Sequence, residues 1–349
     1  MKIINIPIEP IEQRYSTQWA QWFLTEFKEA RLHVETVHGG NTSGVIKDGS
    51  FLDVTETNIY KTSQLLQILQ ILADYDDSYP LILFFHDIWF PGLEAIAYVR
   101  EGRNLKNLRI CGCLHAGSYD SYDFLNKVGM TPWAKFMEYA WFNTIVDEIF
   151  VATHFHKNLI VETRGYRASN TPELRGKIHV TGFPIYQQSF VDKKMYSVKR
   201  PDTITFPHRL DTEKQPDLFV QIASVMQTEY PEWQWIVTKE HCSTKGEYYE
   251  TLHNSKIAIS FALQETWGIA MQEATLCGAI PLCPARLSYL EMYPYQFLYE
   301  NTAHLREKIV EFMRNPPIIS LARLQRFLAA KGEEAIPNII KHLKKYDSQ

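Results

Sequence analysis

The chain has 349 residues, of which 45% are hydrophobic and 13% aromatic, and this length and composition predict two domains with sizeable cores. Its formal charge of −4 gives no overall basic field, so net charge does not predict tight binding of nucleic acid or of an anionic membrane. No apolar run is long enough to cross a membrane and the first residues do not form a signal peptide, so we expect a cytoplasmic protein without a transmembrane segment.

The cysteines form no Cys-x-x-Cys pair, and most of them fall in or beside predicted strands. An odd number of cysteines without a disulfide pattern is typical of reduced thiols, and we expect no structural zinc site. These residues are Cys111, Cys113, Cys242, Cys277 and Cys283.

Short apolar segments alternate with helical patterns in the first half of the chain. A first strand is predicted over 2–6, and the later strands of this half are predicted over 81–85, 109–114, 149–152 and 178–181. Between them, an aromatic stripe (Trp19, Trp22, Phe23, Phe27) and a leucine stripe (Leu65, Leu66, Leu69, Leu72) mark two helices whose apolar faces are typical of core. Strands that alternate with helices predict a doubly wound parallel sheet.

A polar stretch over 187–201 reads as a linker, and a second α/β pattern follows it. Strands are predicted over 203–206, 233–238, 257–261 and 279–283, and a helix over 217–226. The last stretch, 318–346, is helical in pattern, and Pro337 should break or kink it.

Two carboxylates, Glu265 and Glu273, lie eight positions apart between the last two of these strands. Glu265 falls at the mouth of a strand, where ligands bind in an open α/β sheet, and Glu273 falls inside the next helix. Gly268 permits a tight turn into that helix, whose N-terminus offers free N–H groups to an anion. The alternative reading is an ordinary amphipathic helix with two solvated acids.

The segment Glu265-Thr266-Trp267-Gly268-Ile269 to Glu273 resembles the Glu-x7-Glu signature of retaining glycosyltransferases of the GT-B fold, especially the large family 4. The resemblance covers most of the chain and is most specific over 203–284. It implies that Glu265 contacts the transferred sugar, that Glu273 holds the ribose of the nucleotide, and that the residues from Thr266 to Ile269 line the donor site.

This resemblance implies an α/β architecture with two Rossmann-like domains, a cleft between them, and a C-terminal helix that crosses back. The acceptor-side domain is expected over 1–188, a linker over 189–200, the nucleotide-sugar domain over 201–325, and the returning helix over 326–349.

A strand end at Phe206 leads into Pro-His-Arg209-Leu-Asp-Thr-Glu-Lys214. This resembles the family's Gly-Arg-Leu…Lys-Gly segment, in which the Arg and the Lys bind the donor pyrophosphate. The departing diphosphate gains negative charge, and two fixed cations stabilise it without a metal. His208 replaces the usual Gly, and Gln215-Pro216 replaces the Gly after the Lys. The alternative is a helix-capping loop with surface cations.

His115 ends a predicted strand, and by resemblance it contacts the sugar at the reacting centre; a lone His is otherwise a structural residue. His86-Asp87 also follows a strand and resembles an earlier loop of the family, although a packed His with an Asp cap is an equal alternative. Asp120, with Asp123, is a further candidate for binding acceptor or donor hydroxyls.

The loop after the first strand departs from the family, because 7–17 lacks the usual Gly-rich sequence. Arg14, Tyr15 and Ser16 become candidates for acceptor recognition, and Ser16 or Thr17 could cap the following helix. The pair Asp74-x-Asp76 has the spacing of a metal-binding motif but lies in a polar turn, so we read it as solvated.

The implied reaction moves a hexose or pentose from a nucleotide sugar to a hydroxyl with retention, without a cofactor or a metal. A double displacement would need a carboxylate nucleophile, for which no residue is identified. The working hypothesis is therefore a same-face reaction, in which the departing phosphate helps to deprotonate the acceptor. The identity of the sugar and nucleotide and the oligomeric state stay open.

The opening segment and the compact size resemble phage-encoded enzymes that glycosylate hydroxymethylated pyrimidines in DNA, which would act in the host cytoplasm. Two basic clusters could follow phosphates, or they could be ordinary solvated charges. They comprise Arg100, Arg103, Lys106 and Arg109, then Arg164, Arg167, Arg175 and Lys177. A saccharide, lipid-linked or small-molecule acceptor is the competing enzymatic hypothesis. A non-catalytic GT-B module that binds a nucleotide or glycan is the alternative from another class.

Overall fold

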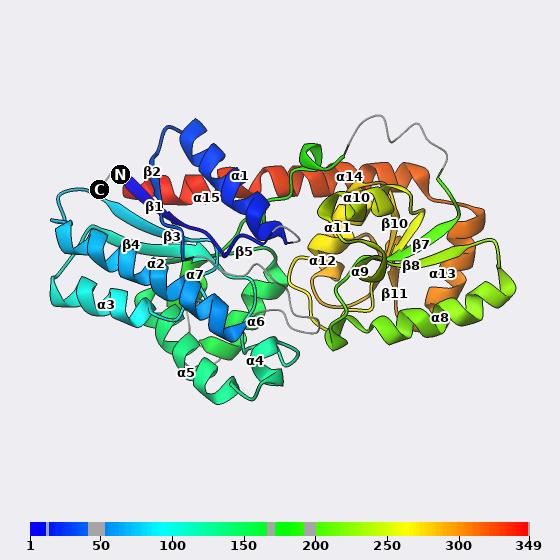
Figure 1. The fold of residues 1–349 in the computed structure, drawn as a ribbon, viewed down its shortest axis with the longest axis horizontal. Coiled ribbons are helices and arrows are strands. Elements are labelled where there is room, and N and C mark those ends of the chain that lie inside the picture. Colours follow the sequence, from blue (N-terminus) through cyan, green and yellow to red (C-terminus); the bar gives the residue numbers. More distant parts are fainter. Residues whose placement is uncertain (12–13, 41–52, 166–171, 192–199, 348–349) are drawn as a thin grey trace. The chain divides into compact units, whose positions relative to one another are not determined.

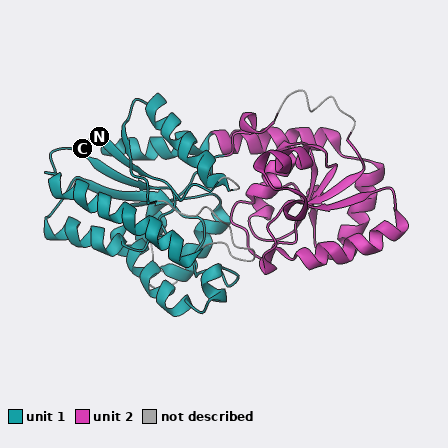
Figure 2. Cartoon of the chain, viewed as in Figure 1, with its two compact units in different colours: residues 1–184, 334–349 teal, residues 185–333 magenta. Residues whose placement is uncertain are grey.

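A computed structural model of the chain describes residues 1–11, 14–40, 53–165, 172–191 and 200–347 (Figure 1). Most of the predicted linker, including Lys193, Lys194 and Lys199, lies outside the described residues, as does Arg167. The chain forms two compact units (Figure 2), of which the first comprises 1–184 and 334–349 and the second comprises 185–333.

The first unit is built on a six-stranded parallel sheet with the order β2-β1-β3-β4-β5-β6. Its strands are β1 (Lys2–Ile6), β2 (His33–Thr36), β3 (Leu81–Phe85), β4 (Leu108–Cys113), β5 (Glu148–Val151) and β6 (Ile178–Val180). All five residues of β3 are buried, as expected for a central strand that helices cover on both faces.

The longest helices of this unit are α1 (Tyr15–Glu29) and α2 (Val54–Asp74). The others are α3 (Leu93–Gly102), α4 (Phe124–Lys127), α5 (Thr131–Ala140), α6 (His154–Arg164), α7 (Pro172–Lys177) and α15 (Ala335–Leu343). The aromatic stripe of α1 is core, because Trp19, Phe23 and Phe27 are fully buried.

The second unit carries a five-stranded parallel sheet with the order β11-β10-β9-β7-β8. Its strands are β7 (Thr203–Phe206), β8 (Gln234–Val237), β9 (Ile257–Ile259), β10 (Ile280–Pro284) and β11 (Leu298–Tyr299). Its helices are α8 (Pro216–Glu229), α9 (Thr238–His241), α10 (Lys245–His253), α11 (Ile269–Leu276), α12 (Tyr289–Met292), α13 (Thr302–Arg314) and α14 (Ile318–Glu333).

The two parallel sheets with their helices confirm the predicted α/β class. The predicted strands agree with the observed ones within two residues at each end, whereas β2 and β11 were not predicted. The predicted cap of α1 is wrong: α1 begins at Tyr15, so Ser16 lies inside its first turn, and Ser16 Oγ accepts a hydrogen bond from the N–H of Ile11.

The C-terminal helical stretch is interrupted between α14 and α15, as expected from Pro337. That residue lies in the first turn of α15, where a proline removes no intrahelical hydrogen bond. Domain boundaries were predicted at 188, 200 and 325, and the structure divides the chain after 184 and after 333. Helix α14 therefore belongs to the second unit and α15 to the first.

Candidate functional site

The strand orders locate a ligand-binding edge in each unit. In the second unit the chain passes from β7 outward to β8 and then back to β9 on the other side of β7. In the first unit it passes from β1 to β2 and then back to β3. Ligands of open α/β sheets bind at such reversals, outside the carboxyl ends of the strands. The segments after β7 and β9, and those after β1 and β3, are therefore where a site is expected.

The predicted cation and acid after β7 and β9 are joined directly in the second unit. Lys214 Nζ lies 3.2 Å from Oε2 of Glu265 and donates a 2.6 Å hydrogen bond to the carbonyl of Gln264. Burial acts to raise the pKa of Glu265, but the charge of Lys214 and nearby groups outweighs it and leaves that pKa below its ordinary value. Burial lowers the pKa of Lys214, while Glu265 opposes this shift. The two side chains form an ion pair at the carboxyl edge of the sheet.

Arg209 belongs to the same cluster. Its guanidinium pairs with Asp211 and with Glu213, two acids of the same loop, and its side chain stays 39% exposed. Burial acts to lower the pKa of Arg209, but Glu213 and Asp211 outweigh it and raise that pKa. The loop thus holds the guanidinium in one position while leaving part of it open to a ligand.

His208 lies between β7 and these cations and is 4% exposed. Its Nε2 has no hydrogen-bond partner among the described residues. Burial, and then the positive charge of Lys214, lower the pKa of His208 to about 3, so the imidazole is neutral at physiological pH. Where the resembled family has a Gly, this chain places a neutral ring beside Lys214.

The turn from Glu265 into α11 depends on Gly268. That residue has φ +76°, and its N–H donates a 2.9 Å hydrogen bond to Oε1 of Glu265. Glu265 therefore accepts at both oxygens, one from the backbone and one from Lys214. Thr266 and Ile269 are partly exposed beside this turn, whereas Trp267 is 2% exposed and packs as core.

Glu273 lies on α11 and is held by side chains of α10. Its Oε1 accepts hydrogen bonds from Lys245 Nζ (2.9 Å) and from the hydroxyl of Tyr249 (2.8 Å), and its Oε2 accepts from the hydroxyl of Tyr248 (3.0 Å). The ammonium of Lys245 also lies 4.8 Å from the centre of each tyrosine ring. The carboxylate predicted to contact ribose is therefore already surrounded by three donors.

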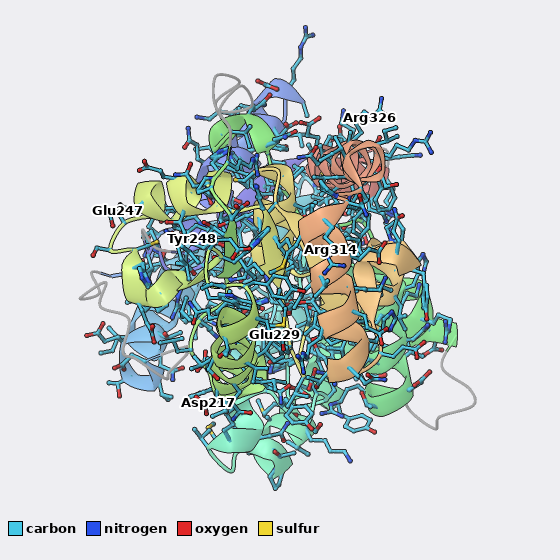
Figure 3. The ribbon with its side chains drawn as sticks, turned by 90° about the vertical axis from the view of Figure 1, so that its right-hand side faces the viewer. Asp217, Glu229, Glu247, Tyr248, Arg314 and Arg326 are labelled. Atoms are coloured by element: carbon cyan, nitrogen blue, oxygen red, sulfur yellow. The ribbon has the colours of Figure 1, made fainter. Side chains whose placement is uncertain are left out.

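The sequence patterns did not identify the residues of α10 that hold Glu273. A Thr-Lys-Gly-Glu sequence predicts only the start of a helix, and Thr244 with Glu247 indeed forms a capping box there. Glu247 and Tyr248 are neighbours on this helix (Figure 3). Only the packing of α10 against α11 brings Tyr248 to Glu273, and no local signal reports that contact.

A pocket lies in the first unit at the carboxyl ends of β1, β3 and β4. Its charged lining residues are Glu9, Arg14, Lys61 and Asp87, and His115 is also part of its wall. Lys61 Nζ donates a 2.7 Å hydrogen bond to the carbonyl of Trp89 and lies 3.8 Å from Asp87. Burial lowers the pKa of Lys61, and the charges of Asp87 and Glu9 oppose this shift.

His115 lines this pocket through a ring whose two nitrogens both have partners. Nε2 donates to the carbonyl of His86 (2.7 Å), so Nδ1 is the acceptor for the hydroxyl of Tyr15 (3.1 Å). Burial lowers the pKa of His115, which keeps the ring neutral. The ring also packs between Trp19 and Phe183, with ring centres 4.8 Å away in each case.

The acceptor candidates separate into pocket residues and structural residues. Arg14, Tyr15 and Asp87 line the pocket with His115, as does Ser16, although Ser16 is 2% exposed. His86 is fully buried, bonds Oδ1 of Asn5 and is not part of the lining, and burial lowers its pKa to about 3. Asp120 is 7% exposed and accepts from the N–H of Tyr122, while Asp123 caps α4.

The arginines of the predicted basic clusters mostly hold structure. Arg100 pairs with Asp147, and Arg103 donates to the carbonyl of Tyr75 at the end of α2. Arg164 is 3% exposed and forms a 2.6 Å ion pair with the fully buried Glu138. Arg164 is therefore not available to follow a phosphate chain.

Within the described part of the chain, no group of three or more His, Cys, Asp or Glu side chains is arranged to hold a metal ion. None of the helices over the same residues is long and apolar enough to cross a membrane.

Comparison with solved structures assigns the architecture. Sucrose-phosphate synthase from Thermosynechococcus elongatus aligns with a TM-score of 0.66 and 11% identity, over 99% of this chain and 98% of that one. The catalytic domain of starch synthase IV from Arabidopsis thaliana, bound to ADP and acarbose, aligns with a TM-score of 0.62 and 11% identity, over 99% and 98% of the two chains. HepE from Anabaena, in complex with UDP and glucose, aligns with a TM-score of 0.61 and 10% identity, over 100% and 99%. The fold is that of the GT-B glycosyltransferases.

Comparison of sequences gives a shorter match. A tRNA-queuosine alpha-mannosyltransferase from Drosophila melanogaster is 35% identical over 124 residues, which is 33% of this chain and 33% of that protein. The match therefore spans about a third of the relative's length. No protein-family model matches the chain.

Proposed function

We propose that this chain is a retaining glycosyltransferase that moves a hexose from a nucleotide sugar to a hydroxyl on a modified nucleoside of a nucleic acid. The observation that carries the proposal is the cluster of Arg209, Lys214 and Glu265 at the strand reversal of the second unit. A diphosphate leaving group needs fixed cations, and a sugar hydroxyl needs a carboxylate acceptor beside them. Both are supplied within one unit.

The donor is expected at the second unit. Arg209 and Lys214 would bind the diphosphate, and Glu265 would accept a hydrogen bond from the sugar. Structural neighbours with the same fold hold UDP with glucose, or ADP, which supports a nucleoside diphosphate as leaving group here. Glu273 would bind the ribose by exchanging one of the hydrogen bonds that Tyr248 and Tyr249 now donate for a ribose hydroxyl.

The chemical step is proposed as a same-face substitution. The acceptor hydroxyl oxygen forms a bond to the anomeric carbon while the bond from that carbon to the diphosphate oxygen breaks. The electron pair leaves with the nucleoside diphosphate, and the hydroxyl proton passes to the departing phosphate oxygen. Arg209 and Lys214 stabilise the charge that develops there, so the step needs no metal ion.

The acceptor class rests on the sequence relative. Its name describes alpha transfer of mannose to queuosine in tRNA, which is a hydroxyl-bearing nucleoside within a nucleic acid. With an α-linked nucleotide sugar as donor, retention gives an α-linked product, which is the linkage in this relative's name. A hydroxymethylated pyrimidine in DNA belongs to the same class of acceptor.

The test combines each of two nucleotide-sugar donors with each of three acceptors. The full chain is incubated with GDP-mannose or UDP-glucose and with queuosine-containing tRNA, DNA containing 5-hydroxymethylcytosine, or methyl α-glucoside, with EDTA present throughout. Transfer to a nucleic acid, with an α-linked product by NMR, is the expected result. A β-linked product would overturn retention, and transfer to the glucoside alone would favour a saccharide enzyme. Nucleotide binding without consumption of any donor would favour a non-catalytic binding module.

A further inference from the structure

The pocket of the first unit contains a carboxylate that the proposed donor chemistry does not use. Glu9 follows β1 in the sequence Pro-Ile-Glu-Pro-Ile and is only 5% exposed. Glu9 lines the pocket, and its buried Oε2 has no hydrogen-bond partner among the described residues. A buried carboxylate oxygen without a donor costs free energy, so a donor from a bound molecule would stabilise it.

A second buried polar atom among the lining residues of this pocket also lacks a hydrogen-bond partner. Thr57, on the first turn of α2, is 7% exposed, and its Oγ1 has no partner among the described residues. Glu9 can only accept hydrogen bonds, whereas the hydroxyl of Thr57 can donate or accept. The hydroxyl of Tyr60, also on α2, is a third buried atom of the lining residues without a partner among the described residues. The pocket therefore offers unused hydrogen-bonding positions on two different elements, the loop after β1 and α2.

The charges around these positions balance. The acids Glu9 and Asp87 and the bases Arg14 and Lys61 all line the pocket, so the formal charges sum to zero. Such a site favours a neutral ligand over a phosphate or an ammonium ion. Phe85 and Phe90 add apolar wall, which suits the face of a ring.

We infer that this pocket binds a neutral ring of the acceptor that carries two neighbouring hydroxyls. One hydroxyl donates to Oε2 of Glu9, and the other pairs with Oγ1 of Thr57. A hydroxyl fits these positions because it donates and accepts at once, which a carboxylate or an ammonium ion cannot do. This inference rests on the proposed function, because it identifies the chemistry of the acceptor for the same reaction.

The inference assigns a positioning role to Glu9. The side chain would bind and orient the acceptor ring, and it has no part in the donor chemistry proposed for the second unit. Loss of Glu9 should therefore weaken acceptor binding and leave consumption of the donor by water unchanged. A residue that only supports the fold would change both.

The experiment measures binding and hydrolysis separately, on the full chain with UDP present. Three probes carry neighbouring hydroxyls on a ring: queuosine nucleoside, uridine and methyl α-glucoside. Calorimetric titration is repeated with Glu9→Gln and Thr57→Val. The matched controls are Glu101→Gln, whose side chain is 76% exposed, and Thr62→Val, which is exposed on α2. Comparison of the probes shows whether the ring belongs to a modified base, to a ribose or to a free sugar.

At least one probe should bind the native chain, and its affinity should fall about tenfold or more in each test variant and less than twofold in each control. Binding of no probe, or a change of less than twofold in Glu9→Gln and Thr57→Val, would overturn the inference. Hydrolysis of GDP-mannose or UDP-glucose without acceptor reports the proposed function independently. A variant that loses binding but keeps hydrolysis supports the inference, whereas absence of hydrolysis in the native chain counts against the reaction itself.

Thermal unfolding supplies a second readout. Replacement of Glu9 by Gln removes a buried charge that lacks a full set of donors. The melting temperature of the Glu9→Gln variant should therefore equal or exceed that of the native chain. A clearly lower melting temperature, with Glu101→Gln unchanged, would assign Glu9 a structural role and overturn the inference.

Discussion

The ammonium of Lys214 lies 3.2 Å from the carboxylate of Glu265, and the two side chains are 6% and 16% exposed. This ion pair joins the loop after β7 to the loop after β9. It places the cation proposed for the leaving group and the carboxylate proposed for the sugar 3.2 Å apart. Each charge is also the other's principal compensation for burial.

Replacement of Lys214 by Met should lower the free energy of unfolding by about 3 kcal/mol, because it leaves Glu265 buried without its cation. The second change Glu265→Leu in the same chain should restore most of this loss, since the unpaired charge is then removed. Urea titration of both variants measures the effect. A double variant as unstable as the single one would show that Lys214 contributes through packing and not through charge. Neither variant should transfer sugar.

Replacement of Arg209 by Ala should reduce kcat by about 10²- to 10³-fold, because a fixed cation on the leaving group is lost at the transition state. Arg209→Lys should recover only part of this rate, since an ammonium cannot keep the contacts to both Asp211 and Glu213 and also meet a phosphate. Steady-state kinetics with a donor that the chain consumes gives the comparison. Arg306→Ala, which removes an exposed pair with Glu229, is the control and should leave kcat unchanged.

Gly268→Ala should destabilise the second unit by about 1–2 kcal/mol through backbone strain alone, because φ is +76°. An added Cβ would also lie 3.2 Å from the ring of Tyr289 and would disturb the turn whose N–H binds Glu265. Gly129→Ala in the first unit has a similar φ of +75° but no atom within 4 Å of the added Cβ. Equal losses of stability and activity in the two variants would refute a special role for Gly268.

The lowered pKa of Glu148 predicts that the first unit loses stability in acid. Burial acts to raise its pKa, but hydrogen bonds from His179, Lys345 and Tyr346 outweigh this and lower the pKa to about 2 from 4.5. A carboxylate with a lowered pKa in the folded state stabilises the fold above pH 4.5, and this contribution disappears as the pH falls toward 2.

Glu148→Gln should therefore unfold at a lower temperature than the native chain at pH 7, with a loss of about 2–3 kcal/mol, and the difference should shrink below pH 4. Melting temperatures recorded from pH 3 to pH 8 measure this. A difference that stays constant over that range would mean that the contribution of Glu148 does not depend on its charge.

The parts of the site that could be predicted depend on local signals. A short β-branched strand, then Glu265, Gly268 and a helix, can be read along a few positions, and so can the strand end before Arg209 and Lys214. The spacing of these segments suffices because parallel strands bring their carboxyl ends to one edge. The proximity of Lys214 and Glu265 follows from that geometry, whereas their ion pair was not predicted.

The remaining contacts could not be predicted, because they depend on which helix faces pack together. Tyr248 and Glu273 come from two helices and meet only through the packing of α10 on α11. Glu9 looks like any polar residue of a loop until its burial is known. The edge strands β2 and β11 were missed because β2 alternates exposed and half-buried residues and β11 has two residues. Edge strands of this kind carry little apolar pattern.

The first unit is completed by residues from the end of the chain, since Lys345 and Tyr346 supply two of the donors to Glu148, and α15 packs against α1. During translation, the strands of this unit therefore emerge from the ribosome well before α15, Lys345 and Tyr346. During that interval Glu148 on β5 has His179 but lacks its other two donors, and α1 lacks α15, so the nascent unit should be a substrate for chaperones until residues 335–346 have emerged.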